Sequence, residues 1–365
     1  MKIVVVGLRG IPGIMGGVET HCEELLPRIA AMAPDLHIEV IGRIPYTGPV
    51  RREVAGVMLV PLPSPVSKSG EAIVSTLRGI LYAKRSGADL VHIHAIGPAL
   101  LVPLARLLGI KVVMTHHGAD YDRGKWGGAA KAMLRLGERL GIGFAHAIIC
   151  VAPSLRASLA ARFPAAADRL VYIPNGAAML PVSDAADSMV LAKLGLIAGE
   201  YCLAVARLVP EKGLSYLIDA YAASGTTRPL VIAGGEMHGD GHANMLRAKA
   251  GPGVVFTGAL PRDVLGVLYR NTALFVMPSF HEGLPIAALE AMASGAPMAM
   301  SDISANRDLG LSAAHYLAVG DADVWAAALG GDLSRFATAG TDAGRAFDWP
   351  TIAADTLAVY RGAIR

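Results

Sequence analysis

Residues 273–297, ALFVMPSFHEGLPIAALEAMASGAP, decide the fold of this 365-residue chain. The first five residues, Ala273 to Met277, are apolar on both faces, as a strand covered by helices on both sides requires. Pro285 suits the first turn of a helix and Gly295 suits its C-terminal cap, so a helix is predicted from about Leu284 to Ser294. A buried strand followed by a loop and a helix is the repeating unit of a doubly wound α/β sheet.

The same unit recurs along the whole chain. Apolar runs predict strands at 2–6, 37–41, 89–94, 111–115, 147–151 and 170–173, and again at 201–206, 229–233, 254–257, 273–277, 297–301 and 316–319. Two successive series predict two Rossmann-like sheets. Residues 174–199 are rich in Ala, Pro, Asp and Ser without a sustained period, so they are interpreted as the linker. We therefore expect domains at 1–178 and 179–348, followed by a terminal helix at 349–365.

Composition excludes several classes of protein. With 53% hydrophobic and 17% charged residues, the chain is too apolar for a disordered protein. Its most apolar stretch, residues 90–105, is interrupted by His92 and His94, so a membrane span is not expected. The three cysteines are far apart, which argues against a disulfide framework and favours the reducing cytoplasm.

Two glutamates flank the start of the predicted helix after strand 273–277. Glu282 lies in the loop, and Glu290 lies inside the helix. The amides of Gly283, Leu284 and Ile286 would lie at its positive end, where they could bind a phosphate while the carboxylates accept hydrogen bonds from hydroxyl groups. The alternative is a pair of surface glutamates.

Basic and glycine-rich segments follow two other strands. Arg207 and Lys212 come after strand 201–206 and could converge on a diphosphate, although a solvated surface pair is the alternative. Gly16 and Gly17 end a glycine-rich loop after strand 2–6 and could offer backbone amides to an anion. A turn needed only for packing explains this loop equally well.

Together these segments resemble the retaining glycosyltransferase family 4, whose fold is GT-B. The resemblance rests on ARLVPEKG at 206–213 and EGLPIAALEAMASGAP at 282–297, and it extends over the chain through GGVE at 16–19, DLVHIH at 89–94, THHG at 115–118 and IPNG at 173–176. It implies an N-terminal acceptor-binding domain and a C-terminal nucleotide-sugar-binding domain that face each other across a cleft, with the terminal helix packing back on the first. The segment HGADYDRGKWG, beginning at His117, resembles a subset that builds bacterial surface polysaccharides.

The resemblance also implies roles for single residues. Glu282 and His117 would act at the donor sugar, and Glu290 would accept hydrogen bonds from the ribose. His117 directly precedes Gly118, as the corresponding histidine does in the family. Because His116 and His117 are adjacent, both remain candidates for this role. The implied donor-binding residues are Gly16, Gly17, Arg207, Lys212, Gly283, Leu284, Pro285, Ile286 and Glu290, and residues suggested for the acceptor side are Arg123, Lys125 and Trp126.

The expected reaction is transfer of a hexose-type sugar from a nucleotide-diphosphate sugar to a lipid-linked glycan acceptor, with retention, in bacterial exopolysaccharide or lipopolysaccharide synthesis. No cofactor and no metal are expected, because fixed cations and a helix terminus already serve the leaving diphosphate. Two alternatives stay open: a nucleotide-sugar epimerase on the same scaffold and a non-catalytic nucleotide-sugar binding protein.

Other motifs are interpreted more simply. Asp321-Ala322-Asp323 is predicted to cap a helix rather than bind a metal. His92 and His94 share one face of a strand, where a structural role is favoured over metal ligation. Lys125 and Trp126 are too few to indicate a nucleic-acid site.

Charge is distributed unevenly along the chain. Residues 1–175 carry 20 Lys and Arg against 12 Asp and Glu, whereas residues 176–365 carry 13 against 18. The basic half could dock on anionic lipid at the inner face of the cell membrane, and ordinary solvated surfaces are the alternative. The basic clusters are Arg51-Arg52, Lys84-Arg85, Arg123–Lys125 and Arg135–Arg139.

Overall fold

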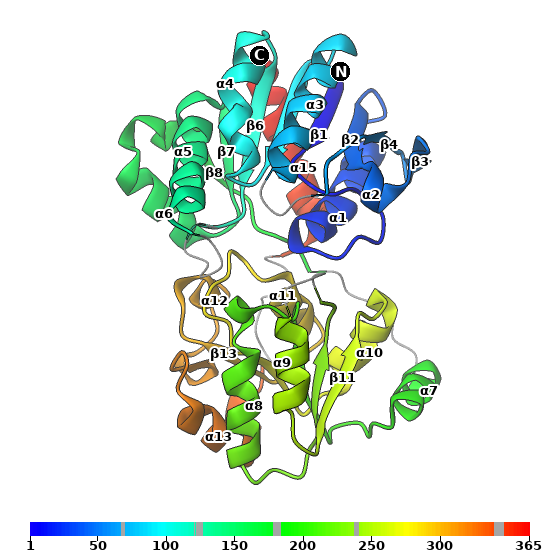
Figure 1. Ribbon diagram of the computed structural model, residues 1–365, viewed down its shortest axis with the longest axis vertical. Coiled ribbons are helices and arrows are strands. Elements are labelled where there is room, and N and C mark those ends of the chain that lie inside the picture. Colours follow the sequence, from blue (N-terminus) through cyan, green and yellow to red (C-terminus); the bar gives the residue numbers. More distant parts are fainter. Residues whose placement is uncertain (67–69, 120, 122–126, 178–183, 237–240, 339–346) are drawn as a thin grey trace. The chain divides into compact units, whose positions relative to one another are not determined.

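The computed structural model describes residues 1–66, 70–119, 121, 127–177, 184–236, 241–338 and 347–365. These residues form two compact units, which can be followed separately in Figure 1. Unit 1 comprises Met1–Gly176 together with Trp349–Arg365, and unit 2 comprises Ala177–Asp348. Each unit is a sheet with its own buried apolar core.

Unit 1 contains an eight-stranded sheet in the order β3-β4-β2-β1-β5-β6-β7-β8. Neighbouring strands are parallel except β3, which is antiparallel to β4. The strands are β1 Lys2–Val6, β2 His37–Arg43, β3 Arg52–Val54, β4 Val57–Leu62, β5 Leu90–His94, β6 Lys111–His116, β7 Ala147–Cys150 and β8 Leu170–Tyr172. The α-helices are α1 Gly17–Met32, α2 Ile44–Thr47, α3 Glu71–Arg85, α4 Val102–Leu107, α5 Gly128–Phe144, α6 Pro153–Arg162 and α15 Trp349–Ile364, and the 3-10 turns are η1 Pro98–Leu101 and η3 Pro164–Arg169.

Unit 2 contains a six-stranded parallel sheet in the order β11-β10-β9-β12-β13-β14. The strands are β9 Cys202–Val205, β10 Leu230–Ala233, β11 Val254–Gly258, β12 Leu274–Met277, β13 Met298–Ser301 and β14 Tyr316–Leu317. The α-helices are α7 Asp184–Leu194, α8 Leu214–Ala223, α9 His242–Lys249, α10 Arg262–Asn271, α11 Ile286–Ala293, α12 Ser304–Arg307 and α13 Ala322–Gly330, and the 3-10 turns are η4 Pro210–Lys212, η5 Ala313–His315 and η6 Ser334–Phe336. The predicted α/β class with two doubly wound sheets is thus confirmed.

Strand order reverses once in each sheet. In unit 1 the chain proceeds from β1 through β2 and then returns to place β5 on the other side of β1. In unit 2 it proceeds from β9 through β10 and β11 and then places β12 on the other side of β9. The loops after two such neighbouring strands diverge, so ligands of open α/β sheets bind at this point.

Helix α15 is far in sequence from the rest of unit 1 but packs against α1 and β6 of that unit. Its Trp349 ring covers Gly176, where an added Cβ would lie 2.4 Å from a ring atom, so only glycine fits. The Tyr360 hydroxyl, which is fully buried, lies 2.7 Å from Nδ1 of His92 in β5. These two contacts attach the helix near its two ends, to the segment after β8 and to β5.

The structure differs from the sequence-based expectation at three elements, β3, β4 and α7. Strands β3 and β4 were not predicted; they form a hairpin whose turn residues, Ala55 and Gly56, both have positive φ. Helix α7 lies inside the stretch interpreted as an irregular linker. It has no clear apolar stripe and is instead attached to α10 by an ion pair, with Asp187 Oδ1 2.7 Å from Nη2 of Arg270.

The Tyr360 contact gives a stability prediction. Tyr360→Phe keeps the ring but leaves Nδ1 of buried His92 without its partner, so the free energy of unfolding of unit 1 should fall by about 1–3 kcal/mol. Scanning calorimetry measures this as a lower melting temperature. Tyr46→Phe, at a hydroxyl that is far more exposed, is the matched control, and an equal melting temperature in wild type and Tyr360→Phe would contradict the assigned bond.

Candidate active site

Lys212 and Glu282 meet at the strand-order reversal of unit 2. Lys212 ends the turn η4 after β9, Glu282 lies in the loop after β12, and Nζ of Lys212 is 2.6 Å from Oε1 of Glu282. Their side chains are 18% and 8% exposed, so the pair is largely shielded from water while still reachable. A cation suited to phosphate and an anion suited to hydroxyl groups are therefore held side by side.

Backbone contacts hold the two loops together. Gly213 has φ 67° and follows Lys212 directly; an added Cβ would lie 2.0 Å from the carbonyl oxygen of Pro278. The amide of Phe280 donates to the carbonyl of Glu211 at 2.9 Å, and the Tyr216 hydroxyl donates to the Pro278 carbonyl at 2.5 Å. Gly213 is consequently required both for its backbone conformation and for this close approach.

Glu290 is held at both oxygens from the neighbouring helix. Oε1 lies 2.6 Å from Nη2 of Arg262, and Oε2 accepts from the Tyr269 hydroxyl at 3.2 Å, with both partners on α10. Glu290 is 7% exposed, so the surface-glutamate alternative is excluded for it. Burial, reinforced by the charge of Glu290, raises the pKa of Tyr269 well above its ordinary value, so its hydroxyl stays protonated and keeps donating.

The start of helix α11 lies two residues later than predicted. Pro285 is the N-cap and Ile286 is the first helical residue, whereas the predicted helix began at Leu284. The reason is that Pro285 has extended backbone angles, with ψ 111°, so Gly283 and Leu284 precede the helix. Leu284 is buried in this loop, and Gly283 is half-buried. Arg207 follows β9 and is half-buried.

In unit 1 the glycine loop between β1 and α1 is clamped by an ion pair that the sequence analysis did not identify. Oε1 of Glu19 accepts from the backbone amide and Nε of Arg9, and Nη2 of Arg9 donates to the carbonyl of Met15 at 2.6 Å. An added Cβ on Gly16 would lie 2.0 Å from Oε2 of Glu19 and 2.4 Å from Nη2 of Arg9, so a side chain there would displace the side chains of this clamp. Gly17 begins α1.

The two neighbouring histidines have different environments. His116 is fully buried; its Nδ1 accepts from the amide of Gly118, and its Nε2 lies 3.1 Å from Oε1 of Glu138. Both of its nitrogens are thus engaged inside the protein. His117 is half-buried and contacts His94, with Nε2 3.0 Å from Nδ1 of that residue. This arrangement favours His117 as the histidine that a substrate can reach.

His117 lies beside three buried histidines, His21, His92 and His94, of which His21 was missed at the sequence level. Nδ1 of His21 lies 2.9 Å from Oδ1 of Asn175, and its ring contacts His117 edge-on at 5.1 Å. Burial lowers the pKa of His21 to about 4 and of His92 to about 3, so both are neutral at pH 7. The apolar helical context of THCEELL gave no signal for this contact, because it joins residues 154 positions apart.

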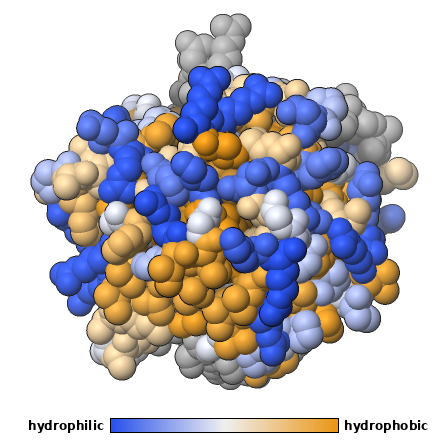
Figure 2. All heavy atoms as spheres, turned by 90° about the horizontal axis from the view of Figure 1, so that it is seen from above, coloured by the Kyte–Doolittle hydropathy of each residue, from blue (hydrophilic) through white to orange (hydrophobic). Residues whose placement is uncertain are grey.

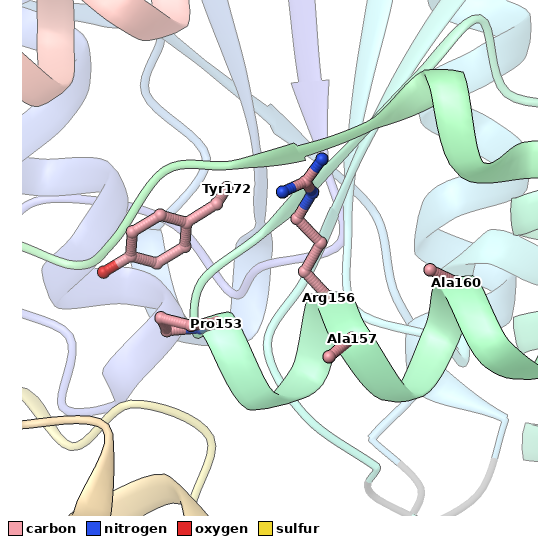
Figure 3. Close-up of a pocket in the computed structure, with 5 residues that line it drawn as sticks. All are labelled: Pro153, Arg156, Ala157, Ala160 and Tyr172. Carbon is pink, nitrogen blue, oxygen red and sulfur yellow. The ribbon is translucent and has the colours of Figure 1, made fainter.

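Figure 3 shows a pocket of about 300 Å³ at the edge of the sheet of unit 1. It is lined by Pro153, Arg156, Ala157 and Ala160 of α6 and by Tyr172 at the end of β8. Arg156 turns toward the strand, where its Nε donates to the Leu170 carbonyl at 3.0 Å. Since β8 is the edge strand, this pocket lies away from the strand-order reversal.

Three predicted residues lie outside the described part of the chain: Arg123, Lys125 and Trp126. Elsewhere, Oδ1 of Asp321 accepts from the amide of Val324 at 3.2 Å, which confirms its role as the N-cap of α13. Within the described ranges, no group of three His, Cys, Asp or Glu side chains is arranged to hold a metal ion.

Comparisons with known proteins agree with this architecture. A family profile described as "Glycosyl transferase 4-like domain" matches residues 16–176, and one described as "Glycosyl transferases group 1" matches residues 199–333. Alpha-maltose-1-phosphate synthase from Mycolicibacterium smegmatis is 27% identical, with 99% of each chain covered. Both profiles lie over the sheets that carry the residues described above, and they define the protein as a glycosyltransferase.

Solved structures show the same fold. Sucrose-phosphate synthase from Thermosynechococcus elongatus has a TM-score of 0.84 at 20% identity, with 99% of this chain and 98% of that chain covered. HepE from Anabaena, solved with UDP and glucose, has a TM-score of 0.76 at 18% identity, with 99% and 100% covered. The chain belongs to the retaining glycosyltransferase family 4 and has the GT-B fold. It is a hexosyltransferase that uses a nucleotide-sugar donor.

The Lys212–Glu282 ion pair predicts energetic coupling. Lys212→Ala removes the ammonium group that contacts Glu282, so the effect of this variant on kcat/KM for the donor should differ between the wild-type and Glu282→Ala backgrounds by about 0.5–3 kcal/mol. Wild type, the two single variants and the double variant form a double-mutant cycle and are compared by steady-state kinetics. The control is Lys249→Ala, which breaks the more exposed pair with Asp219 and should leave kcat/KM unchanged. Additive effects in the cycle would contradict a functional pair.

Proposed function

We propose that this protein transfers a hexose-type sugar from a nucleoside-diphosphate sugar to a lipid-linked glycan acceptor in bacterial exopolysaccharide or lipopolysaccharide synthesis, without a metal. The observation that carries the donor assignment is the Lys212–Glu282 pair at the strand-order reversal of unit 2. It brings one group suited to the diphosphate and one suited to sugar hydroxyls to the same loop cluster.

Breaking the sugar–phosphate bond places negative charge on the departing diphosphate. Stabilising that charge needs fixed cations and oriented dipoles more than it needs a strong nucleophile. In the proposal Arg207 and Lys212 bind the diphosphate together with the first free amides of α11, which begins at Ile286. Gly16 and Gly17 at the start of α1 are proposed as further donor-binding residues through their backbone amides.

The two glutamates receive different roles. Glu282 lies beside Lys212, so it is proposed to accept from hydroxyls of the sugar that the diphosphate carries. Glu290 keeps accepting capacity on each oxygen after bonding to Arg262 and Tyr269, and a diol such as the ribose can use it. His117 is proposed to lie beside the sugar, and front-face substitution with retention follows, because no second carboxylate is assigned as a nucleophile.

The relatives suggest where to begin the search for substrates. HepE was solved with UDP-glucose, and the synthase from Mycolicibacterium acts in maltose-1-phosphate formation by its name. UDP-glucose is therefore the first donor to test. The identity of the base is left to a panel, since the proposed contacts of Glu290 are with the ribose rather than with the base.

The first test is transfer itself. Wild type is expected to release nucleoside diphosphate from one donor in a panel in the presence of EDTA, and NMR should show a product with the anomeric configuration of the donor. Arg207→Ala and Lys212→Ala should each lower kcat/KM by the equivalent of about 1.5–3 kcal/mol, since each loses a charge-assisted bond to phosphate.

Three other outcomes would refute parts of this proposal. Conversion of the free donor to another sugar without acceptor would indicate an epimerase, and diphosphate binding without transfer or donor hydrolysis would indicate a binding protein. Loss of activity in EDTA that magnesium or manganese restores would contradict metal independence.

We further propose that the protein works in the cytoplasm at the inner face of the membrane. No described helix is both long and apolar enough to cross a bilayer. Figure 2 shows that apolar side chains gather into a continuous area on one face, next to polar ones. Helices α4 and α5 contact each other in unit 1. Helix α4 carries exposed Arg106 and Leu107, the latter 84% exposed, and α5 carries exposed Arg139 and Phe144, the latter 49% exposed. We call these four residues the docking face.

Flotation with liposomes tests the docking face. Binding to anionic vesicles should appear at low salt and weaken at high salt, because each basic residue near the surface contributes on the order of 1 kcal/mol. Arg106→Glu with Arg139→Glu should abolish flotation, whereas Ile197→Ser, at an apolar site of unit 2 that is 70% exposed, should not. Equal binding to neutral and anionic vesicles, or none, would contradict electrostatic docking.

A further inference from the structure

Two fully buried side chains lie in series behind His117. Nδ1 of His94 is 3.0 Å from Nε2 of His117, and Nε2 of His94 is 3.5 Å from Sγ of Cys22. His94 and Cys22 are both 0% exposed. In the described part of the chain, the only hydrogen bond of the His117 ring is the one to His94, so its Nδ1 is left for a ligand.

Each member of this series carries a fixed number of protons. Burial lowers the pKa of His94 and of His117 well below the usual range, and the neighbouring histidines His21 and His92 lower both further. Each imidazole is therefore neutral and holds one N–H. Burial, assisted by the charge of Glu19, raises the pKa of the Cys22 thiol well above its usual value, so the thiol stays protonated.

The other groups around the cluster do not compete for His94. His92 uses Nδ1 for the Tyr360 hydroxyl and Nε2 for the Thr115 hydroxyl, each at 2.7 Å. His21 uses Nδ1 for Asn175 at 2.9 Å. His116 is engaged by Glu138 and by the Gly118 amide. The hydrogen bonds of the series Cys22–His94–His117 therefore determine which ring nitrogen of His94 and of His117 carries the proton.

Only two arrangements satisfy both contacts. In the first, the Cys22 thiol donates to Nε2 of His94, and Nδ1–H of His94 donates to Nε2 of His117. In the second, Nε2–H of His117 donates to Nδ1 of His94, and Nε2–H of His94 donates to the sulfur of Cys22. The thiol is a weak donor and its sulfur a weak acceptor, but the second arrangement leaves the proton of the buried Cys22 thiol without an acceptor among the contacts of the described residues, so the first arrangement is favoured.

We propose that Cys22 and His94 are positioning residues that fix His117 as the Nδ1–H tautomer. His117 then meets its substrate as a neutral hydrogen-bond donor aimed at a lone-pair oxygen of the sugar or of the bond being broken, and it does not act as a general base. This role for His117 rests on the function proposed above, whereas its tautomer does not.

NMR measures the tautomer directly. Long-range proton–nitrogen correlation spectra of protein labelled with ¹⁵N-histidine distinguish Nδ1–H from Nε2–H rings, and His117→Asn assigns the relevant signals by their loss. Wild type at pH 7 should show His117 as Nδ1–H. A ring protonated at Nε2 would overturn the proposal, whatever the activity of the enzyme.

Variants of Cys22, at the far end of the series, test whether this thiol sets the tautomer of His117. Cys22→Ser keeps a donor and should preserve the Nδ1–H tautomer, whereas Cys22→Ala removes the donor and should give a mixture. Cys150→Ala, at another buried thiol of unit 1, is the matched control and should leave His117 unchanged. A pure Nδ1–H ring in folded Cys22→Ala would remove Cys22 from the proposal.

Enzyme activity tests separately whether His117 acts as a hydrogen-bond donor to the substrate. An asparagine amide places its nitrogen near Nδ1 of histidine and a glutamine amide near Nε2, so His117→Asn should retain about tenfold more kcat than His117→Gln. Equal loss in both variants would overturn the donor role. Full activity in both, with the Nδ1–H tautomer observed, would refute the place of His117 in the proposed function and leave the tautomer assignment standing.

Discussion

Strand order reverses between β1 and β5 and between β9 and β12. The positions of the candidate site residues in each unit depend on these two reversals. At each one, loops from neighbouring parallel strands turn away from each other and leave their helix starts and side chains accessible. Lys212 and Glu282 come from the two strands of the second reversal, and the glycine loop and His94 come from the two strands of the first. The rest of each sheet supplies the rigid, buried scaffold that holds these loops.

Close backbone approach turns this topology into a defined geometry. Gly213 lies against the Pro278 carbonyl, and Gly7 lies against the backbone of His94, where an added Cβ would be 2.3 Å from the carbonyl oxygen. Both glycines therefore join the two strands of a reversal at their ends. Polar side chains then hold these regions in place. In unit 2, Arg262 and Tyr269 hold Glu290, and in unit 1, Arg9 and Glu19 hold the glycine loop.

The sequence predicted most of the scaffold because parallel strands buried on both faces are short, apolar and bounded by recognisable loops. It failed at β3 and β4, whose Ala55-Gly56 turn lacks the usual Asn-Gly signal, and at α7, which is attached through Asp187 rather than through an apolar stripe. The positions of Lys212, Glu282 and Glu290 after strands could be inferred, since their motifs are local. The contacts of Arg262 with Glu290, of His21 with Asn175 and of Cys22 with His94 could not, because only the fold brings these distant residues together.

The central claim is that the donor diphosphate binds at the strand-order reversal of unit 2. A crystal structure of the protein with the nucleoside diphosphate of its donor measures this most directly. We predict phosphate oxygens within hydrogen-bond distance of Arg207, Lys212 and the first amides of α11, with ribose hydroxyls on Glu290. A diphosphate bound elsewhere, with the Lys212–Glu282 pair left without contact to the ligand, would contradict the account.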